Sequence, residues 1–279
     1  MKTLRLGTRG SRLALAQTSE VATRLTTLHP GLAIDPVIVQ TSGDIHLDAN
    51  LASPGPLTKG LFTKELEAAL LDGSIDAAVH SLKDLPVDLP PGLVLAAIPE
   101  RADEGDCLVS KLPGGWRELP PRATVATSSP RRRNQLLHLR RDFQVVDIRG
   151  NIDTRLEKLR VTAAWDALVV AAAAIQRLGA ATIPRELHVT RIEEMLPAPG
   201  QGAIGIECLG SNHEIRQLLS SIHHPPTAEC VLAERRVLKC LGGGCAMPLG
   251  VRARVSNGLL DIKAALFLPD RIRPISLAE

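Results

Sequence analysis

A single cysteine within a run of glycines is the feature of this sequence most suited to chemistry. Residues 242–250 read Gly-Gly-Gly-Cys-Ala-Met-Pro-Leu-Gly, which places Cys245 where little side-chain packing is available. Glycine allows backbone conformations and close approaches that larger residues oppose. We interpret Cys245 as a thiol presented to hold a group, although this motif alone equally fits a glycine turn with an incidental cysteine.

Three other segments combine arginine with glycine or hydroxyl residues, and each follows a predicted strand. They are 8–12 (Thr-Arg-Gly-Ser-Arg), 127–133 (Thr-Ser-Ser-Pro-Arg-Arg-Arg) and 149–155 (Arg-Gly-Asn-Ile-Asp-Thr-Arg). Guanidinium groups and the N–H groups of a helix start both bind anions. Ligands of α/β sheets lie beyond the carboxyl ends of strands, so we expect one shared cleft for a small polyanion. A solvated basic turn is the simpler alternative for each segment taken alone.

A fourth segment, His-Ser-Leu-Lys-Asp at 80–84, also follows a predicted buried strand. Lys83 and Asp84 in a cleft could act as acid and base, or stabilise a developing charge. An adjacent lysine and aspartate are more often a plain surface pair, and only their position after the strand favours a functional role.

Histidines and cysteines near the C-terminus raise the question of a metal. His223 and His224 precede Cys230, Cys240 and Cys245, but their spacing matches no compact zinc motif. Cys230 and Cys240 fall within a helical pattern typical of core residues. We therefore expect no metal, and a zinc-dependent protein is the weakest of the alternatives.

Composition narrows the class of partner. The chain has 279 residues, with 25 Arg against 8 Lys, three Phe, two Trp and no Tyr. So few aromatic residues argue against base stacking, and hence against nucleic acid as a partner. No apolar run reaches the roughly 18 residues of a membrane span, and the N-terminus does not resemble an export signal. Five scattered cysteines without an export signal predict free thiols in the reducing cytoplasm. We also expect a monomer that does not bind membranes.

Alternating strands and helices predict an α/β fold. Predicted strands lie at 4–8, 33–41, 75–79, 124–127, 144–148, 167–171 and 202–208. Predicted helices lie at 12–28, with Ser11 as its cap, and at 61–70, 131–140 and 172–178. A further predicted helix at 154–160 has a capping box of Thr154 and Glu157. A helix at 228–241 and two strands joined at Asn257-Gly258 follow. These elements indicate three domains: 1–98 with 202–220, 99–201, and an α+β domain at 221–279.

Seven motifs in this order resemble the porphobilinogen deaminase family, also called hydroxymethylbilane synthase. They span nearly the whole chain at 4–11, 59–67, 80–86, 127–132, 149–156, 199–203 and 243–250. The resemblance implies two lobes like those of periplasmic binding proteins and a third domain with the cofactor cysteine. It implies a dipyrromethane held by Cys245 through a thioether, onto which four porphobilinogen units are added with loss of ammonia. Water would then release hydroxymethylbilane.

The resemblance also implies roles for individual residues. Asp84, with Lys83, would be catalytic: its carboxylate would stabilise the methylene-pyrrole cation left by deamination and move the proton lost on coupling. The residues implied to contact the cofactor are Ser81, Lys83, Asp84, Thr127, Ser128, Ser129, Arg131, Arg132, Arg149 and Gly150. Those implied to contact the substrate are Arg9, Ser11, Lys59, Phe62, Arg149, Arg155, Arg177 and Gln201.

Two departures from the family pattern lead to further expectations. The approach to Lys59, residues 51–58, is longer than usual, which puts the closure of the loop over the cleft in question. The chain also ends where relatives usually continue into a helix, so either the third domain is trimmed or the chain is incomplete. Loss of that helix would leave apolar sheet surface uncovered, so we expect reduced stability of the third domain. The main alternative to an enzyme is a non-catalytic cytoplasmic protein that binds or senses a small polyanion on the same two-lobed fold.

Overall fold

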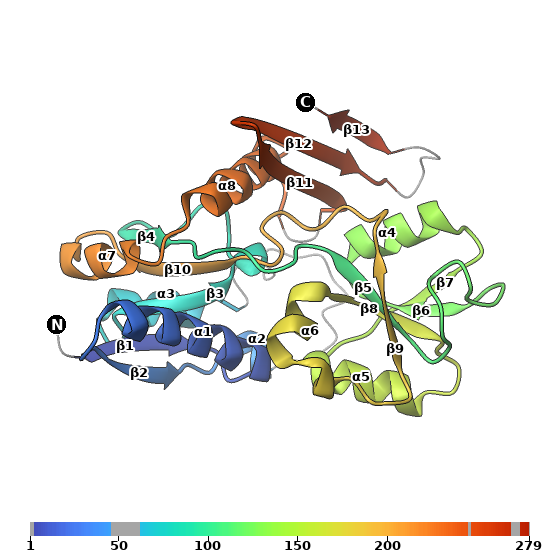
Figure 1. Ribbon diagram of the computed structural model, residues 1–279, viewed down its shortest axis with the longest axis horizontal. Helices are drawn as coiled ribbons and strands as arrows, with labels where there is room; N and C mark the ends of the chain where they lie inside the picture. The colour runs from blue at the N-terminus through green and yellow to red at the C-terminus, as the bar shows by residue number, and fades with distance from the viewer. Residues whose placement is uncertain (1–2, 46–61, 245–246, 269–273, 279) are drawn as a thin grey trace. The chain divides into compact units, whose positions relative to one another are not determined.

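Two compact units make up the computed structural model, which describes residues 3–45, 62–244, 247–268 and 274–278. The first unit comprises Met1–Arg101 and Ala203–Glu229, and the second comprises Ala102–Gly202 and Cys230–Glu279. Each contains a five-stranded sheet with helices, and a three-stranded sheet belongs to the second (Figure 1). The α/β class with a small additional α+β part is therefore confirmed.

The sheet of the first unit has the order β2-β1-β3-β10-β4. These strands are β2 (Ala33–Ile38), β1 (Thr3–Thr8), β3 (Ala77–Ser81), β10 (Ile204–Leu209) and β4 (Leu93–Ala97). β1 pairs in parallel with β2 and β3, whereas β10 is antiparallel to β3 and β4. The predicted return of the strand after residue 202 to the first lobe is thus confirmed.

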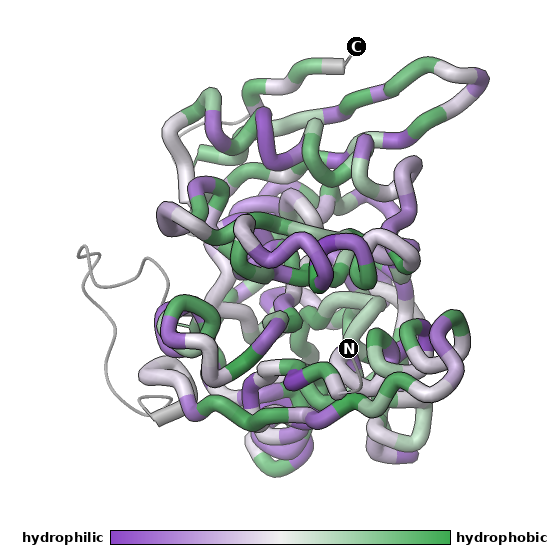
Figure 2. Tube along the Cα trace, turned by 90° about the vertical axis from the view of Figure 1, so that its left-hand side faces the viewer, coloured by the Kyte–Doolittle hydropathy of each residue, from purple (hydrophilic) through white to green (hydrophobic). Residues whose placement is uncertain are grey.

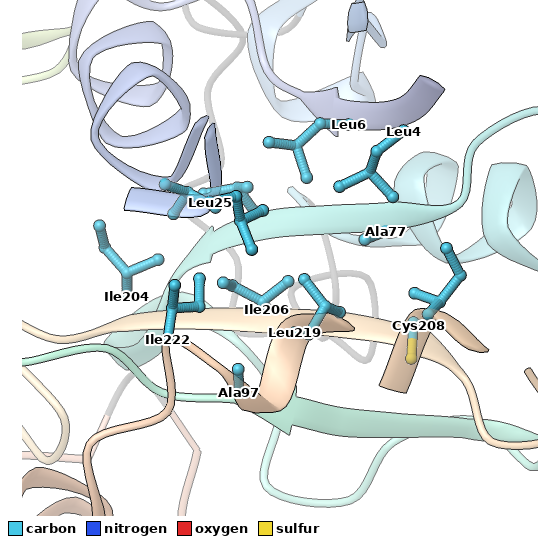
Figure 3. Close-up of a cluster of buried hydrophobic side chains, with 13 residues drawn as sticks. Leu4, Leu6, Leu25, Ala77, Ala97, Ile204, Ile206, Cys208, Leu219 and Ile222 are labelled. Atoms are coloured by element: carbon cyan, nitrogen blue, oxygen red, sulfur yellow. The ribbon is translucent and has the colours of Figure 1, made fainter. Parts of the chain in front are cut away.

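Helices cover both faces of this sheet. α1 (Arg12–Leu28) and α7 (His213–Ser220) pack on one face, and α3 (Lys64–Leu71) packs on the other. Figure 3 shows the first face, where Leu6 of β1 and Ile206 of β10 lie among Leu25 of α1 and Leu219 of α7. Burying each such leucine or isoleucine contributes about 1.5–3 kcal/mol, so this cluster fixes the strands on which the candidate residues sit. The remaining short helices are α2 (Ser42–Ile45) and a 3-10 turn, η2 (Leu82–Asp84).

The large sheet of the second unit has the order β7-β6-β8-β5-β9. Its strands are β7 (Gln144–Val146), β6 (Thr124–Ala126), β8 (Ala167–Ala171), β5 (Asp106–Ser110) and β9 (His188–Ile192). β6 is parallel to β7 and β8, and β5 is antiparallel to β8 and β9. The helices are α4 (Pro130–Leu139), α5 (Ile152–Val161), α6 (Ala172–Leu178) and the 3-10 turn η3 (Ala180–Thr182).

The part of a long helix from Cys230 onward and a small antiparallel sheet complete the second unit. The helix is α8 (Pro225–Cys240), and the strands are β11 (Leu249–Ser256), β12 (Leu259–Leu266) and β13 (Ile275–Ala278). The predicted tight turn between β11 and β12 is confirmed, because Asn257 and Gly258 have φ values of 51° and 76°. Hydrophobic and hydrophilic residues alternate along the middle of β11, where Val251 and Ala253 are buried and Arg254 is exposed, as a strand with one buried face requires (Figure 2).

Most predicted elements are present, and the differences have local causes. β3 begins and ends two residues later than predicted, so His80 and Ser81 belong to the strand. α5 begins at Ile152 with Asn151 as its cap, so the capping box expected at Thr154 is wrong: the Asn151 side chain already accepts the hydrogen bond from the Thr154 N–H. Strands β4, β5, β9 and β13 and helix α7 were not predicted. The division into three domains stays a prediction.

Candidate active site

In the first unit, the strand ends that carry candidate residues lie at one edge of the sheet. β1 and β3 are parallel, so their carboxyl ends face the same way. Arg9 and Ser11 follow β1, while Lys83 and Asp84 lie in η2 directly after β3. The sheet topology therefore brings these four residues to a common edge, as their positions after strands predicted.

Asp84 is exposed, and its carboxylate has no hydrogen-bond partner among the described residues. The backbone beneath it is firmly held. The N–H of Leu82, a fully buried residue, donates to Ala203 O at 3.0 Å. The Ser81 hydroxyl and the Gln17 amide exchange hydrogen bonds of 3.0 and 3.1 Å. An unoccupied carboxylate on a rigid support is suited to hold a cation or a proton.

Arg9 and Phe62 form a stacked pair at this edge. The guanidinium carbon of Arg9 lies 4.1 Å from the centre of the Phe62 ring. Such a cation–π contact orients the guanidinium. Ser11 instead caps α1, because its hydroxyl accepts from the Ala14 N–H at 3.3 Å. The predicted cap is confirmed.

In the second unit, one edge of the large sheet also gathers the candidate residues. The carboxyl ends of β6, β7 and β8 face the same way because these strands are parallel. β5 is antiparallel to β8, so its first residue, Asp106, pairs with Ala171 at that edge. The Thr127–Arg133 and Arg149–Arg155 segments begin here.

Arg131 and Arg132 are buried, and both contact the carboxylate of Asp106. Arg131 Nη1 donates to Asp106 Oδ2 at 2.6 Å. Arg132 Nε and Nη2 donate to Asp106 Oδ1 at 3.0 and 2.8 Å. Two arginines in the first turn of α4 oppose its macrodipole. Their pairing with the buried Asp106 carboxylate explains why the helix tolerates them. The sequence pattern did not indicate Asp106 as their partner.

The network leaves donors for a ligand carboxylate. A guanidinium has five N–H donors, and Arg131 and Arg132 each make three hydrogen bonds. Besides Asp106, their acceptors are Leu196 O, Val169 O and the Gln201 amide oxygen. Arg131 Nε is buried and has no hydrogen-bond partner among the described residues. Burial lowers the pKa of Arg131, and the neighbouring Asp106 opposes that shift. This donor set fits a group that carries several carboxylates.

The hydroxyls between β6 and α4 support the local backbone. Ser128 Oγ donates to Ile148 O at 2.7 Å and accepts from Ile148 N–H at 2.9 Å, which ties this loop to the end of β7. Ser129 caps α4 by accepting from the Arg132 N–H. Thr127 Oγ1 accepts from the Ser129 N–H at 3.2 Å. These contacts fix where the arginines of α4 begin.

Arg149 is the exposed cation of this edge. Its guanidinium has no partner among the described residues. The following residue, Gly150, has a φ of 113°, and the Arg155 Nε donates to its carbonyl at 2.8 Å. Arg177 donates to Gly202 O at 3.0 Å. Arg149 is thus presented to solvent by a turn that another arginine stabilises.

Gln201 connects the arginine network to the small sheet. Its amide nitrogen donates to Glu104 O at 2.7 Å and to Asp106 Oδ1 at 3.1 Å. The flanking Gly200 has a φ of 73°, and its N–H donates to the buried Glu234 of α8 at 2.8 Å. The other oxygen of Glu234 accepts from the Ala253 N–H of β11 at 3.0 Å.

Cys245 and Lys59 lie outside the described residues, as does the 51–58 segment. The residues on either side of Cys245 are close together, because the Met247 N–H donates to Gly244 O at 2.9 Å. By contrast, Cys107 and Cys208 are buried, and burial raises the pKa of each thiol to about 11. Those two thiols are protonated at neutral pH and poorly nucleophilic.

The described residues give no gathering of three or more His, Cys, Asp or Glu side chains suited to a metal. His223 accepts from the Ile98 N–H, and His224 pairs with Thr227 at the start of α8. Over the same ranges, no helix is long and apolar enough to cross a membrane.

Three buried polar residues at these sites were not anticipated: Asp106, Gln17 and Glu234. Asp106 had a detectable signal, since it is a charged residue at the start of the apolar run Cys107–Val109. Gln17 and Glu234 lie within helices, where a polar residue ordinarily faces solvent.

The fold and its two polar sheet edges define a two-lobed α/β ligand-binding protein with a small additional sheet. Residues 4–217 match the family model described as "Porphobilinogen deaminase, dipyromethane cofactor binding domain". Residues 228–277 match "Porphobilinogen deaminase, C-terminal domain". The chain belongs to the porphobilinogen deaminase family, and the resemblance of its motifs is confirmed.

Similar proteins named porphobilinogen deaminase occur in several bacteria. The one from Syntrophotalea carbinolica is 47% identical over 259 residues, which are 93% of this chain and 81% of that protein. The one from Syntrophobacter fumaroxidans is 44% identical, over 94% of this chain and 83% of that protein. Among solved structures, the periplasmic VFT2 domain of Bordetella pertussis BvgS has 15% identity and a TM-score of 0.48, covering 84% and 94% of the two chains.

Proposed function

We propose that this protein carries out the reaction for which its family is named. It removes ammonia from porphobilinogen and joins four of the resulting units head to tail on a dipyrromethane primer held by Cys245. Water then releases hydroxymethylbilane. The observation that supports this most directly is Asp84, an exposed carboxylate without a described partner. Hydrogen bonds to Gln17 and Ala203 hold Ser81 and Leu82, which lie just before it in the chain.

The second unit offers the donors that would hold the primer. Arg131 Nε is a buried donor without a hydrogen-bond partner among the described residues, and Arg132 and Arg149 have further N–H groups to offer. Guanidinium groups pair with acetate and propionate side chains through two parallel hydrogen bonds. When bound, the dipyrromethane supplies the free pyrrole carbon at which the chain grows. Thr127, Ser128, Ser129 and Gly150 shape the backbone around these arginines.

The first unit offers the groups that would act on the incoming substrate. We assign to the Asp84 carboxylate oxygens the stabilisation of positive charge on the substrate pyrrole and the uptake of the proton lost on coupling. Lys83 would assist beside it. Arg9, stacked on Phe62, would bind a substrate carboxylate, and Ser81 would keep the strand end in place through Gln17. Ser11, Lys59, Arg155, Arg177 and Gln201 complete the proposed substrate contacts.

Three further properties belong to the proposal. The protein acts as a cytoplasmic monomer, its ligands are small molecules rather than nucleic acid, and its 221–279 segment is a separate cofactor-attachment domain. Sedimentation of the purified protein tests the monomer. The four described cysteines are free thiols, which is compatible with a reducing compartment.

The experiment that tests the function is conversion of porphobilinogen by the wild type, Asp84→Asn and Asp35→Asn. Asp35 is an exposed carboxylate of β2 on the same sheet and provides the matched control. We expect the wild type and Asp35→Asn to form hydroxymethylbilane alike. Asp84→Asn should lose about 10²- to 10⁴-fold in kcat while keeping its thermal stability. Absence of turnover in all three proteins, with porphobilinogen bound but unchanged, would support a binding protein instead.

A further inference from the structure

A cluster of buried acidic and imidazole groups lies directly behind the strand end that carries Asp84. His80 of β3 and Glu207 of β10 are 5% and 0% exposed, and Glu67 of α3 is 8% exposed. β3 and β10 are neighbouring strands (Figure 1). In their register His80 lies opposite Gly205. Glu207 lies two residues after Gly205 on β10, so its side chain projects from the same face of the sheet as that of His80.

His80 and Glu207 form a close contact within this cluster. His80 Nε2 lies 3.1 Å from Glu207 Oε2, which makes an ion pair when the imidazole is protonated. Burial raises the pKa of Glu67, and the negative charge of Glu207 adds to that shift. Burial and the charge of Glu207 both oppose ionisation of Glu67, and Glu207 is the carboxylate that contacts His80.

The other groups around this cluster are few. α3 contributes Glu67, the exposed Lys64 and the hydroxyl of Thr63, whereas β4 contributes the apolar Leu95. Among the described residues, both oxygens of Glu207, Oε1 of Glu67 and Nε2 of His80 lack a hydrogen bond of good geometry. Buried polar groups without good partners are costly, so such a cluster calls for an explanation beyond packing.

The position of the cluster suggests that explanation. His80 is followed at once by Ser81, which Gln17 holds from the opposite face of the sheet. The next residue, Leu82, is fully buried, and a Cβ on Gly205 would come within 2.9 Å of its side chain. The His80–Glu207 contact thus lies on the face of the sheet that α3 covers, whereas the Gln17 amide holds Ser81 on the face that α1 covers. Both contacts lie immediately before the turn that carries Asp84.

We propose that His80 is a positioning residue that acts through Glu207 to fix the end of β3, and with it the direction of the Asp84 carboxylate. This inference rests on the proposed function for the role of Asp84, but the placement of the turn can be measured independently. An error of about 1 Å in a catalytic group can cost on the order of 10²-fold in rate. Loss of the pair should therefore lower kcat and leave KM nearly unchanged.

The test compares Glu207→Gln, His80→Gln, the apolar double variant His80→Leu/Glu207→Leu and the control His29→Gln. His29 pairs with Ser221 at an exposed position. The double variant matters because replacing a buried ion pair by packed apolar groups often preserves stability, whereas breaking one partner leaves a buried charge. We expect the double variant to fold, to lose about 10- to 100-fold in kcat, and to keep KM within about twofold of the wild type.

Hydrogen exchange provides the second readout and needs no turnover. The Leu82 and Leu85 N–H groups are hydrogen-bonded in the turn, and β4 offers a reference segment on the same sheet. We expect exchange of the 82–85 amides to accelerate at least about tenfold in the double variant, with residues 93–97 unchanged. Wild-type exchange and wild-type kcat in a folded double variant would overturn the proposal. If the wild type fails to convert porphobilinogen, the function fails, and the exchange result still decides whether His80 positions the turn.

Discussion

Both units place charged residues just after the carboxyl ends of parallel strands, but one unit exposes its charged group and the other buries and pairs them. In the first unit, Asp84 is exposed and its carboxylate has no partner among the described residues. In the second unit, Arg131 and Arg132 are buried and share the carboxylate of Asp106. One edge leaves a reactive group open on a rigid turn, whereas the other builds a rigid charged network inside the protein.

The difference shows that position after a strand does not decide how a charged side chain is used. A guanidinium has five donors, so it can bind an internal carboxylate and still offer N–H groups to a ligand. A carboxylate that must receive a proton or a positive charge has to be left without such a partner. In the second unit, arginines that pair with an internal carboxylate can therefore still bind a ligand. In the first unit, an internal partner of Asp84 would compete with the substrate for its carboxylate.

The largest expected effect comes from removing the shared carboxylate of the second unit. Asp106→Asn leaves two buried guanidiniums without their counter-charge, so we expect a loss of about 3–5 kcal/mol in the free energy of unfolding. Urea denaturation followed by circular dichroism measures it. Asp147→Asn, which removes the partner of Arg133 at an exposed position, should cost less than about 1 kcal/mol. Equal losses in the two variants would contradict the contrast between buried and exposed pairs.

A smaller effect is expected from the exposed arginine of the same edge. Arg149→Ala removes a guanidinium that has no described partner, so stability should change by less than about 0.5 kcal/mol. Porphobilinogen conversion should nevertheless weaken by about 1.5–3 kcal/mol in kcat/KM, because a charged hydrogen bond to substrate or primer is lost. Arg133→Ala is the matched control, since Arg133 is bonded to Val145 O and Asp147. Unchanged kcat/KM in Arg149→Ala would remove this residue from the site.

A third prediction concerns how the buried carboxyl group of Glu67 in the first unit makes stability depend on pH. Burial raises the pKa of Glu67 above its ordinary value of 4.5 in the folded protein. The folded state then binds more protons than the unfolded state as pH rises through that value, so the free energy of unfolding falls with pH. Glu67→Gln lacks this fall, and its stability relative to the wild type should increase over the pH interval just above 4.5. Parallel stability curves for the two proteins over that interval would rule out the raised pKa.

The smallest effect is expected at Asp142 in the second unit, and its sign is opposite. The hydrogen bond from Arg140, aided by the Arg122 N–H, holds the pKa of Asp142 well below its ordinary value of 3.8. Its contribution to stability is present above that value and is lost as pH falls toward the lower folded pKa. Asp142→Asn should therefore differ most from the wild type at neutral pH and approach it in acid. A difference that grows in acid would contradict this assignment.

The sequence predicted the elements whose local signals agree with their tertiary setting. α1 has the predicted bounds and its predicted cap at Ser11, and β8 with α6 occur as expected. The strand after residue 202 was assigned to the first lobe because such lobes exchange strands, and β10 confirms this. Strand β13 and the true start of α5 were not foreseen, because edge strands and competing caps have weak local patterns.

The candidate site was only partly predictable, for a physical reason. Residue type and position after strands identified Arg9, Asp84 and Arg149, and the family resemblance added Phe62. Among the described residues, the Asp84 carboxylate and the Arg149 guanidinium have no partner. The partners that hold such groups come from distant segments: Asp106 for α4, Gln17 for Ser81, and Glu207 for His80. Long-range polar contacts of this kind have no spacing signature in a single sequence, so only the fold reveals them.

The most direct test of the account is the intact mass of the purified protein beside that of Cys245→Ser. The account predicts that the wild type exceeds its sequence mass by two linked pyrrole units, and that the excess is absent from the variant. Because burial keeps the Cys107 and Cys208 thiols protonated, they should carry none of it. An active wild type at its bare sequence mass, or a variant that keeps the excess, would contradict a primer held at Cys245.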